Sequence, residues 1–230
     1  MSSEANLSLM QHFTPAFFKF LRDLNENNNR DWFAANRARF IADVEGPMLA
    51  FINDFAPALR SISPAYIVDR RRIGGSTYRI YRDTRFSEDK RPFKTWLAAR
   101  FEHEARRKVE SVPGFYLHLG IDHCFAGGGV YHVERPGLTR IRQRIVDLPD
   151  EWRRAKAGLE IQGEQLKRGP AGFPATHEHL EDLKRQQLYA GTQLTESDVV
   201  AEGFLERFTE VCVRAAPLIE FQTKALGLRW

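Results

Sequence analysis

The chain has 230 residues, a length that predicts one large domain or two small ones. Its hydrophobic content of 43%, which includes 17 phenylalanines, is enough for a sizeable core, and 28% of its residues are charged. The formal net charge of +4 is mildly basic and does not by itself indicate a nucleic-acid-binding protein.

The two cysteines, Cys124 and Cys212, form neither a disulfide framework nor a CxxC metal pair, so we expect both to be reduced thiols. The N-terminus lacks the basic and apolar regions of a signal peptide. No apolar run approaches the roughly 20 residues that span a bilayer. These observations predict a bacterial-type cytoplasmic protein that does not act in a membrane.

Residues 13–62 carry aromatic and aliphatic side chains at helical spacing and predict a helical unit. The pair Thr14-Pro15 is typical of a helix start, with a hydroxyl cap before proline at the first helical position. The run Asn27–Asn29 predicts the end of this helix and a cap for the next one. The pair Gly46-Pro47 predicts a break between the second and third helices.

Residues 65–133 change to short alternating segments and predict a sheet. The segment Phe115–Leu119 alternates apolar residues with Tyr116 and His118, which is the period-two pattern of a half-buried strand. Because no helical pattern separates the strands, we expect an antiparallel meander. The other expected strands are residues 66–73, 96–102 and 124–132.

Residues 137–230 predict helices again. The expected helices cover 138–148, a segment that starts at Pro149, a short stretch marked by Leu180, Leu183 and Leu188, a start box at Thr195–Asp198, and a long helix at 204–219. Helices, then strands, then helices predict an α+β fold. We therefore expect a single domain from residue 1 to 230, with a central antiparallel sheet flanked by N-terminal and C-terminal helices.

The segment from Arg79 to Lys94, here called the arginine loop, combines six basic and three acidic side chains with three aromatic rings. Arginine binds phosphate or carboxylate through two parallel hydrogen bonds and keeps its charge. The loop therefore predicts an anion site, in which Asp83 or Asp89 orients the arginines or acts as a base. The alternative is an internal network of ion pairs that fixes the loop to the sheet.

We expect the anion to be a phosphorylated or carboxylated small molecule in an arginine-lined cleft. The expected anion ligands are Arg79, Arg82, Arg85, Lys90, Lys94 and Arg142. The expected orienting or polar side chains are Asp83, Asp89, Tyr116 and His118. Two alternatives remain open. One is a nucleic-acid-binding module on the same basic face, with Phe86 or Trp96 as a stacking group, which the modest net charge disfavours. The other is a structural or protein-interaction domain.

Other patterns predict no cofactor and no metal site. His103, His118, His123 and His132 have no spacing typical of a compact metal motif. The run Gly127–Gly129 matches neither a Walker motif nor a dinucleotide fingerprint, and indicates a bulge or a close approach of two backbones. No nucleophile elbow is present. The sequence leaves open whether the protein is an enzyme, which substrate or partner it takes, and its oligomeric state.

Four segments together resemble a known family. They are Trp32-Phe33 after an asparagine-rich turn, Arg79–Thr95, Gly114-Phe-Tyr-x-His118, and Ile141-Arg142. These segments are similar to those of the conserved hypothetical family named domain of unknown function 2461. The resemblance covers the chain from about Phe13 to the last helix, and Phe93 stands where the family often has tyrosine. The resemblance implies a single α+β domain of bacterial type and no particular activity or catalytic residue.

Overall fold

The computed structural model describes residues 11–71, 74–107 and 112–230 of the chain. Five strands form one antiparallel sheet whose spatial order, β1-β2-β3-β4-β5, equals their order in the sequence. The strands are β1 (Tyr66–Ile67), β2 (Trp96–His103), β3 (Gly114–Gly120), β4 (Cys124–Val130) and β5 (Leu188–Leu194). The predicted α+β fold and the predicted antiparallel meander are confirmed.

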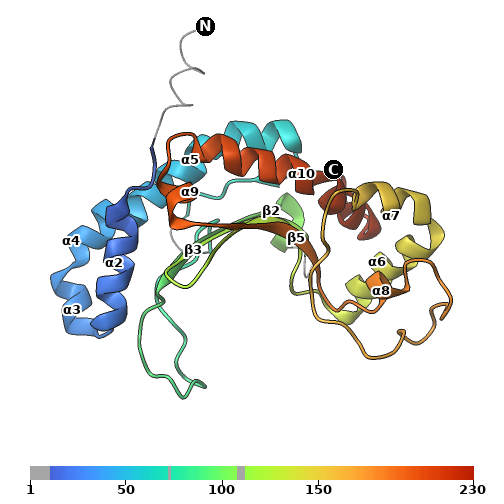
Figure 1. Ribbon diagram of the computed structural model, residues 1–230, viewed down its shortest axis with the longest axis horizontal. Helices are drawn as coiled ribbons and strands as arrows, with labels where there is room; N and C mark the ends of the chain where they lie inside the picture. Colours follow the sequence, from blue (N-terminus) through green and yellow to red (C-terminus); the bar gives the residue numbers. More distant parts are fainter. Residues whose placement is uncertain (1–10, 72–73, 108–111) are drawn as a thin grey trace, which may run out of the picture.

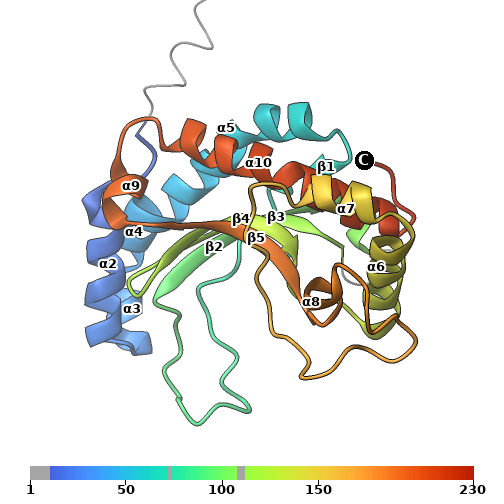
Figure 2. The same cartoon turned by 45° about the vertical axis from the view of Figure 1, so that its right-hand side comes forward.

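Helices lie at both ends of the chain, and two long helices cover one face of the sheet (Figures 1 and 2). The N-terminal helices are α2 (Pro15–Glu26), α3 (Arg30–Ala35), α4 (Arg37–Phe40) and α5 (Gly46–Ile62). The C-terminal helices are α6 (Arg135–Asp147), α7 (Pro149–Ala155), α8 (Leu180–Leu183), α9 (Glu196–Val200) and α10 (Phe204–Ala225). The covering helices are α5 and α10, and none of the described helices covers the opposite face of the sheet, here called the open face (Figure 2).

The helix boundaries follow local capping chemistry, with two corrections to the sequence prediction. The Asn29 side chain accepts a hydrogen bond from the Trp32 N–H at 2.9 Å and caps α3, as predicted. Thr14 does precede α2, but its side chain forms no capping hydrogen bond. The predicted break at Gly46-Pro47 is wrong, because the π-helical turn Ile41–Glu45 joins α4 to α5 and places the proline in the first turn of α5.

Two buried clusters of apolar side chains hold the fold together. The larger cluster lies between the sheet and helices α2, α5 and α10, and contains Phe51, Phe55, Phe101 and Phe208, all at most 1% exposed. The smaller cluster packs α6 and α7 on the other end of α10 around Trp152, which is fully buried. Because α10 contributes to both clusters, it connects the N-terminal and C-terminal halves of the structure.

The fifth strand was not predicted. Leu188, expected on a short helix, instead begins β5, and α8 ends at Leu183. β5 pairs with β4 over its whole length, from Leu194 opposite Cys124 to Leu188 opposite Val130. The segment expected to be helical therefore also supplies one edge strand of the sheet, on the edge opposite β1.

Gly128 on β4 allows α10 to lie close to the sheet. A Cβ atom at this position would lie 2.5 Å from Cδ1 of Ile219 on α10 and 2.7 Å from the Gly114 carbonyl oxygen. Real Cβ atoms do not approach other atoms so closely, so a larger residue requires the helix or the neighbouring strand to move. The close backbone approach predicted from the glycine run is confirmed.

None of the described helices is long and apolar enough to cross a lipid bilayer.

Gly128→Ala is expected to lower the free energy of unfolding by about 1–3 kcal/mol, because the added methyl group overlaps Ile219 and the Gly114 carbonyl. Urea denaturation followed by circular dichroism measures the change. The control is Gly169→Ala, where a Cβ meets only the end of the Leu180 side chain at 3.3 Å and should change stability little. Equal stability of Gly128→Ala and the wild type would contradict the tight contact between α10 and β4.

Candidate functional site

The open face of the sheet carries a groove of about 530 Å³, here called the open-face groove. The arginine loop hangs beyond the sheet on one side of this face, and the segment around α8 lies on the other side (Figures 1 and 2). Most of the lining side chains are rings, and none is acidic. The lining consists of Tyr78, Trp96, Arg100, Gly114, Tyr116, His118, His123, Phe125, Gly128, Gly129, Tyr131, His132, Gln162, Tyr189 and Gln193.

Strand alternation places these rings on one side of the sheet. Phe115, Leu117 and Leu119 of β3 are fully buried on the side of α5 and α10. Tyr116 and His118 alternate with them and therefore point to the open face, as the sequence predicted. The same alternation brings other residues of β2, β4 and β5 to this face.

Glycines in the middle of the open face let an aromatic ring lie directly on the backbone of the sheet. Gly127 of β4 lies opposite Gly191 of β5, and the Phe125 ring lies over both. A Cβ at Gly191 would lie 2.3 Å from Cζ of that ring, and one at Gly127 would lie 2.9 Å from the same atom. Side chains at these two positions would push the ring away from the sheet. The floor of the groove therefore depends on bare backbone below an aromatic ring.

A column of stacked groups forms one end of the groove. The Lys94 ammonium lies 4.4 Å from the centre of the Trp96 ring, within the distance of a cation–π interaction. The Trp96 and His118 rings are 4.8 Å apart, and His118 stacks on His123 at 4.3 Å with an angle of 7° between the planes. The column therefore runs from a cation at the rim to two imidazoles inside the groove.

Lys94 is half-buried and forms no ion pair with a described residue. Its ammonium donates a hydrogen bond to the Arg79 carbonyl oxygen at 3.0 Å and also lies 5.5 Å from the centre of the Tyr78 ring. Burial lowers the pKa of Lys94, and the charge of Arg79 lowers it further. Lys94 thus places next to the groove a cation that has no ion-pair partner among the described residues.

Tyr116 and His118 are coupled inside the groove. The Tyr116 hydroxyl lies 3.2 Å from Nδ1 of His118. Burial lowers the pKa of His118 to about 4, and the neighbouring His123 and Lys94 act in the same direction, while Asp122 opposes them. The imidazole is therefore neutral at pH 7, with Nδ1 able to accept the hydroxyl proton. Burial also raises the pKa of Tyr116, so that its hydroxyl stays protonated.

Arg100 supplies the one guanidinium of the groove lining. Its Nη2 donates to the Val112 carbonyl oxygen at 2.9 Å, and its Nε lies 3.3 Å from a Glu102 carboxylate oxygen. These contacts fix the guanidinium and leave its charge partly neutralised. Arg100 thus contributes less free charge to the groove than Lys94 does.

Three arginines of the arginine loop form ion pairs with aspartates of the same loop. The Asp89 carboxylate accepts from Arg91 at 2.8 Å and from Arg82 at 2.6 Å, and these hydrogen bonds hold the pKa of Asp89 well below its usual range. Arg85 pairs with Asp83 at 2.7 Å, which lowers the pKa of Asp83 to about 2. The loop is therefore cross-linked by ion pairs along its exposed part.

The base of the arginine loop is anchored to the N-terminal helices. The backbone of Phe93 is bonded at both ends to the Asn28 side chain, at 3.1 Å through its N–H and at 3.0 Å through its carbonyl. The Phe93 ring is buried and stacks on Phe33 at 4.1 Å. At the other end of the loop, Phe86 is 96% exposed. A tyrosine hydroxyl at position 93 would thus have to fit into a closely packed aromatic contact.

The predicted site residues occupy three separate places: the open-face groove with its rim, the exposed part of the arginine loop, and helix α6. Lys94, Tyr116 and His118 lie at or in the open-face groove, and Arg79 lies beside Lys94. The other charged candidates of the loop lie along its exposed part, where Lys90 donates to the Thr84 carbonyl oxygen at 3.1 Å. These candidates are Arg82, Asp83, Arg85, Asp89 and Lys90.

Arg142 lies on α6, away from the arginine loop (Figure 2), and is 7% exposed. Its Nη2 donates to the Arg185 carbonyl oxygen at 2.9 Å, and burial lowers its pKa. Neither of the two pockets described includes Arg142 in its lining. The structure therefore does not bring Arg142 together with the other predicted anion ligands.

The histidines are also divided between the two faces of the sheet. His118 and His123 lie in the groove, whereas His103 points to the other face and its Nε2 lies 2.9 Å from the Arg229 carbonyl oxygen. Across residues 11–71, 74–107 and 112–230, no cluster of three histidine, cysteine or carboxylate residues is placed to hold a metal ion.

Several groove residues were not expected from the sequence. Arg100 and Phe125 lie on expected strands, so period-two alternation along those strands could have found them, whereas Tyr78 lies five residues beyond the expected strand 66–73 and is brought to the groove by tertiary structure. Tyr189 and Gln193 could not be found, because they lie on β5, which was not predicted.

Comparison with protein-family models identifies the chain. The model of the family described as Conserved hypothetical protein (DUF2461) matches residues 16–221. The chain belongs to the DUF2461 family. No curated protein matches it. The matched residues include the whole sheet and the arginine loop, so both are parts of the DUF2461 region rather than additions to it.

Asp89→Asn is expected to loosen the arginine loop, because it weakens the pairs with both Arg82 and Arg91. Hydrogen exchange of the amides in residues 82–91 should become about fivefold faster. The melting temperature should fall by less than about 3 °C, since exposed ion pairs contribute little to global stability. The control is Glu88→Gln, which removes a neighbouring charge that forms no ion pair with a described residue. Unchanged exchange in Asp89→Asn would contradict this prediction.

His118 should make stability depend on pH between about 4 and 6.5. The imidazole of the unfolded chain takes up a proton below about pH 6.5, whereas the folded one resists protonation down to about 4. The stabilisation of about 3 kcal/mol is therefore complete above pH 6.5 and is lost as the pH falls towards 4.

Urea denaturation between pH 4 and 7.5 measures this effect, and His118→Gln should show a flatter dependence on pH than the wild type. An NMR titration of the imidazole gives the pKa in the folded state directly. A pKa of about 6.5 for His118, with equal pH dependence of the two proteins, would show that the ring is not desolvated.

Proposed function

We propose that the open-face groove binds a small anionic molecule that carries a ring able to pack on aromatic side chains, with its phosphate or carboxylate group next to Lys94. The observation that supports this proposal most is the Lys94 ammonium, which is half-buried against Trp96 and has no carboxylate partner among the described residues. A desolvated cation without a counter-ion gains most from an anionic ligand.

The lining favours a ligand with a flat face. The His118 and His123 rings are stacked, and the Trp96 ring is tilted by 35° against His118, so this column offers an aromatic surface on which a further ring can pack. The groove volume of about 530 Å³ lies within the usual range of small-molecule sites, roughly 300–1,000 Å³. These features favour a ring-bearing anion over a bare inorganic ion.

The charges near the groove favour an anion over a cation. The groove lining includes Arg100 and no acidic side chain, and Lys94 and Arg79 add positive charge at the rim. His118 is neutral at pH 7, so it can exchange hydrogen bonds with a ligand without adding charge. The proposal assigns binding to this site and assigns no reaction to it.

We assign a structural role to Arg82, Arg85 and Arg91, which differs from the anion-binding role that the sequence suggested for the first two. Their ion pairs with Asp83 and Asp89 support this assignment. The same pairs weaken the nucleic-acid alternative, because a phosphate backbone would have to displace carboxylates that the arginines already contact. We propose Lys94 and Arg79 as the anion ligands instead.

We further propose that the protein acts in the cytoplasm. Cys124 and Cys212 are both buried and unpaired, which fits a reducing compartment.

Lys94→Gln is expected to weaken ligand binding at least tenfold, because it removes a charge-assisted hydrogen bond of about 1.5–3 kcal/mol. The probes are adenosine monophosphate, galacturonic acid and other ring-bearing phosphates and carboxylates, measured by calorimetry at constant ionic strength. Lys90→Gln is the matched control, since it removes an exposed lysine from the same loop and should change affinity less than twofold.

Two results would overturn the proposal. One is that no probe stabilises or binds the protein beyond a sodium chloride control of equal ionic strength. The other is that Lys90→Gln weakens binding as much as Lys94→Gln does, which would place the anion on the exposed part of the loop.

A further inference from the structure

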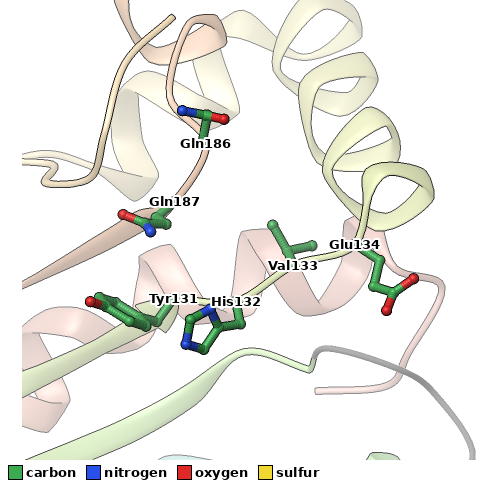
Figure 3. A pocket seen from close by; sticks show the side chains of 6 residues that line it. All are labelled: Tyr131, His132, Val133, Glu134, Gln186 and Gln187. Carbon is green, nitrogen blue, oxygen red and sulfur yellow. The ribbon is translucent and has the colours of Figure 1, made fainter. Parts of the chain in front are cut away.

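A second, smaller cavity of about 260 Å³ continues the open-face groove. Tyr131 and His132, which follow β4, line both the groove and this cavity. Gln186 and Gln187, which precede β5, lie on the other side of the cavity from these two rings (Figure 3). The Glu134 carboxylate points away from them in the same view.

The second cavity differs from the groove in its chemistry. Its lining combines two amide side chains, an imidazole and a phenol, all able to donate and accept hydrogen bonds, with Val133 and with Glu134, whose carboxylate points away. Gln187 accepts one bond, from the Glu164 N–H at 3.3 Å, and Gln186 is exposed. This end of the site therefore suits a neutral group with several polar atoms.

The two ends of the site are far apart. Trp96 lies opposite Gly120, Glu102 opposite Gly114, and Gly114 opposite Gly129. Trp96 and Gly129 are thus separated by six residues along the strands and two strand spacings across them, which corresponds to roughly 20 Å. Lys94 lies beyond Trp96 and His132 lies beyond Gly129, so the cation and the polar cavity lie at opposite ends of this diagonal.

We infer that the ligand is an elongated anion of at least two ring units, with its charged group at Lys94 and a neutral hydrogen-bonding ring at His132, Gln186 and Gln187. This inference rests on the proposed function of the groove. A single nucleotide or sugar acid covers only part of the distance between the two ends. Oligonucleotides and acidic oligosaccharides share the required chemistry: rings with a face that packs on aromatic side chains, polar ring edges and an anionic group.

The experiment compares ligands of one and two units in each class. One pair is adenosine monophosphate and the adenosine dinucleotide with a terminal phosphate; the other is galacturonic acid and its dimer. In one of the two classes, the second unit should increase affinity about tenfold on the wild type. Gln186→Ala, at a residue that lines the second cavity and not the groove, should reduce the affinity of the two-unit ligand about fivefold, without changing that of the one-unit ligand.

Gln143→Ala is the matched control, because Gln143 is an exposed glutamine on α6 whose side chain contacts Asp147. It should leave both affinities unchanged. All substituted positions are exposed, and thermal denaturation checks that each variant is folded.

The outcomes separate this inference from the proposed function. Equal affinity for one-unit and two-unit ligands, or equal loss of both on Gln186→Ala, would overturn the inference and leave the proposed binding of an anion intact. Absence of binding by every ligand in both classes would overturn the proposed function as well. A gain in only one class identifies that class as the ligand.

Discussion

The packing of α10 on the sheet is the contact on which the rest of the structure depends. This helix contributes to both apolar clusters, and the missing side chain at Gly128 lets Ile219 lie against the backbone of β4. Together, α5 and α10 bury the apolar side chains on one face of the sheet. None of the described helices covers the opposite face, so its side chains border an open groove.

An uncovered sheet face is usually polar, because apolar residues there gain nothing from folding. Here the face carries Trp96, Phe125 and Tyr189, and its backbone is bare at Gly127 and Gly191. Rings beside a low floor form a concave surface, whereas rings on a fully substituted strand would form a convex one. The shape of the groove thus follows from where glycine occurs in β4 and β5.

The sequence predicted the fold class and most elements because their signals are local. Helical spacing identified α2 and α10, and alternation identified β3 with the correct orientation of Tyr116 and His118. Alternation did not identify the strand Leu188–Leu194, because glycine, threonine and glutamine interrupt its apolar residues. Its pairing with β4 is a long-range property that the local sequence does not show. The π-helical turn before Gly46 was missed for a similar reason, since its backbone pattern has no sequence signature of its own.

The site was harder to predict than the fold because the composition of a segment does not reveal which of its charged side chains form ion pairs. The charge of the arginine loop predicted an anion site. The carboxylates that neutralise Arg82, Arg85 and Arg91, however, lie within the same loop. Lys94 has the same charge and lies at the end of that segment, but its contacts with Trp96 and Tyr78 come from tertiary structure. Whether a cation has an acidic partner depends on these neighbours, which the sequence pattern does not reveal.

The position of Trp96 gives the groove an optical reporter of its own. Indole emission responds to changes in polarity and to nearby charge, and this ring lies between an ammonium group and an imidazole. Trp152, in contrast, is fully buried in the second apolar cluster and is shielded from anything that enters the groove. A molecule that settles on the open face therefore changes the emission of one tryptophan while leaving another as an internal reference.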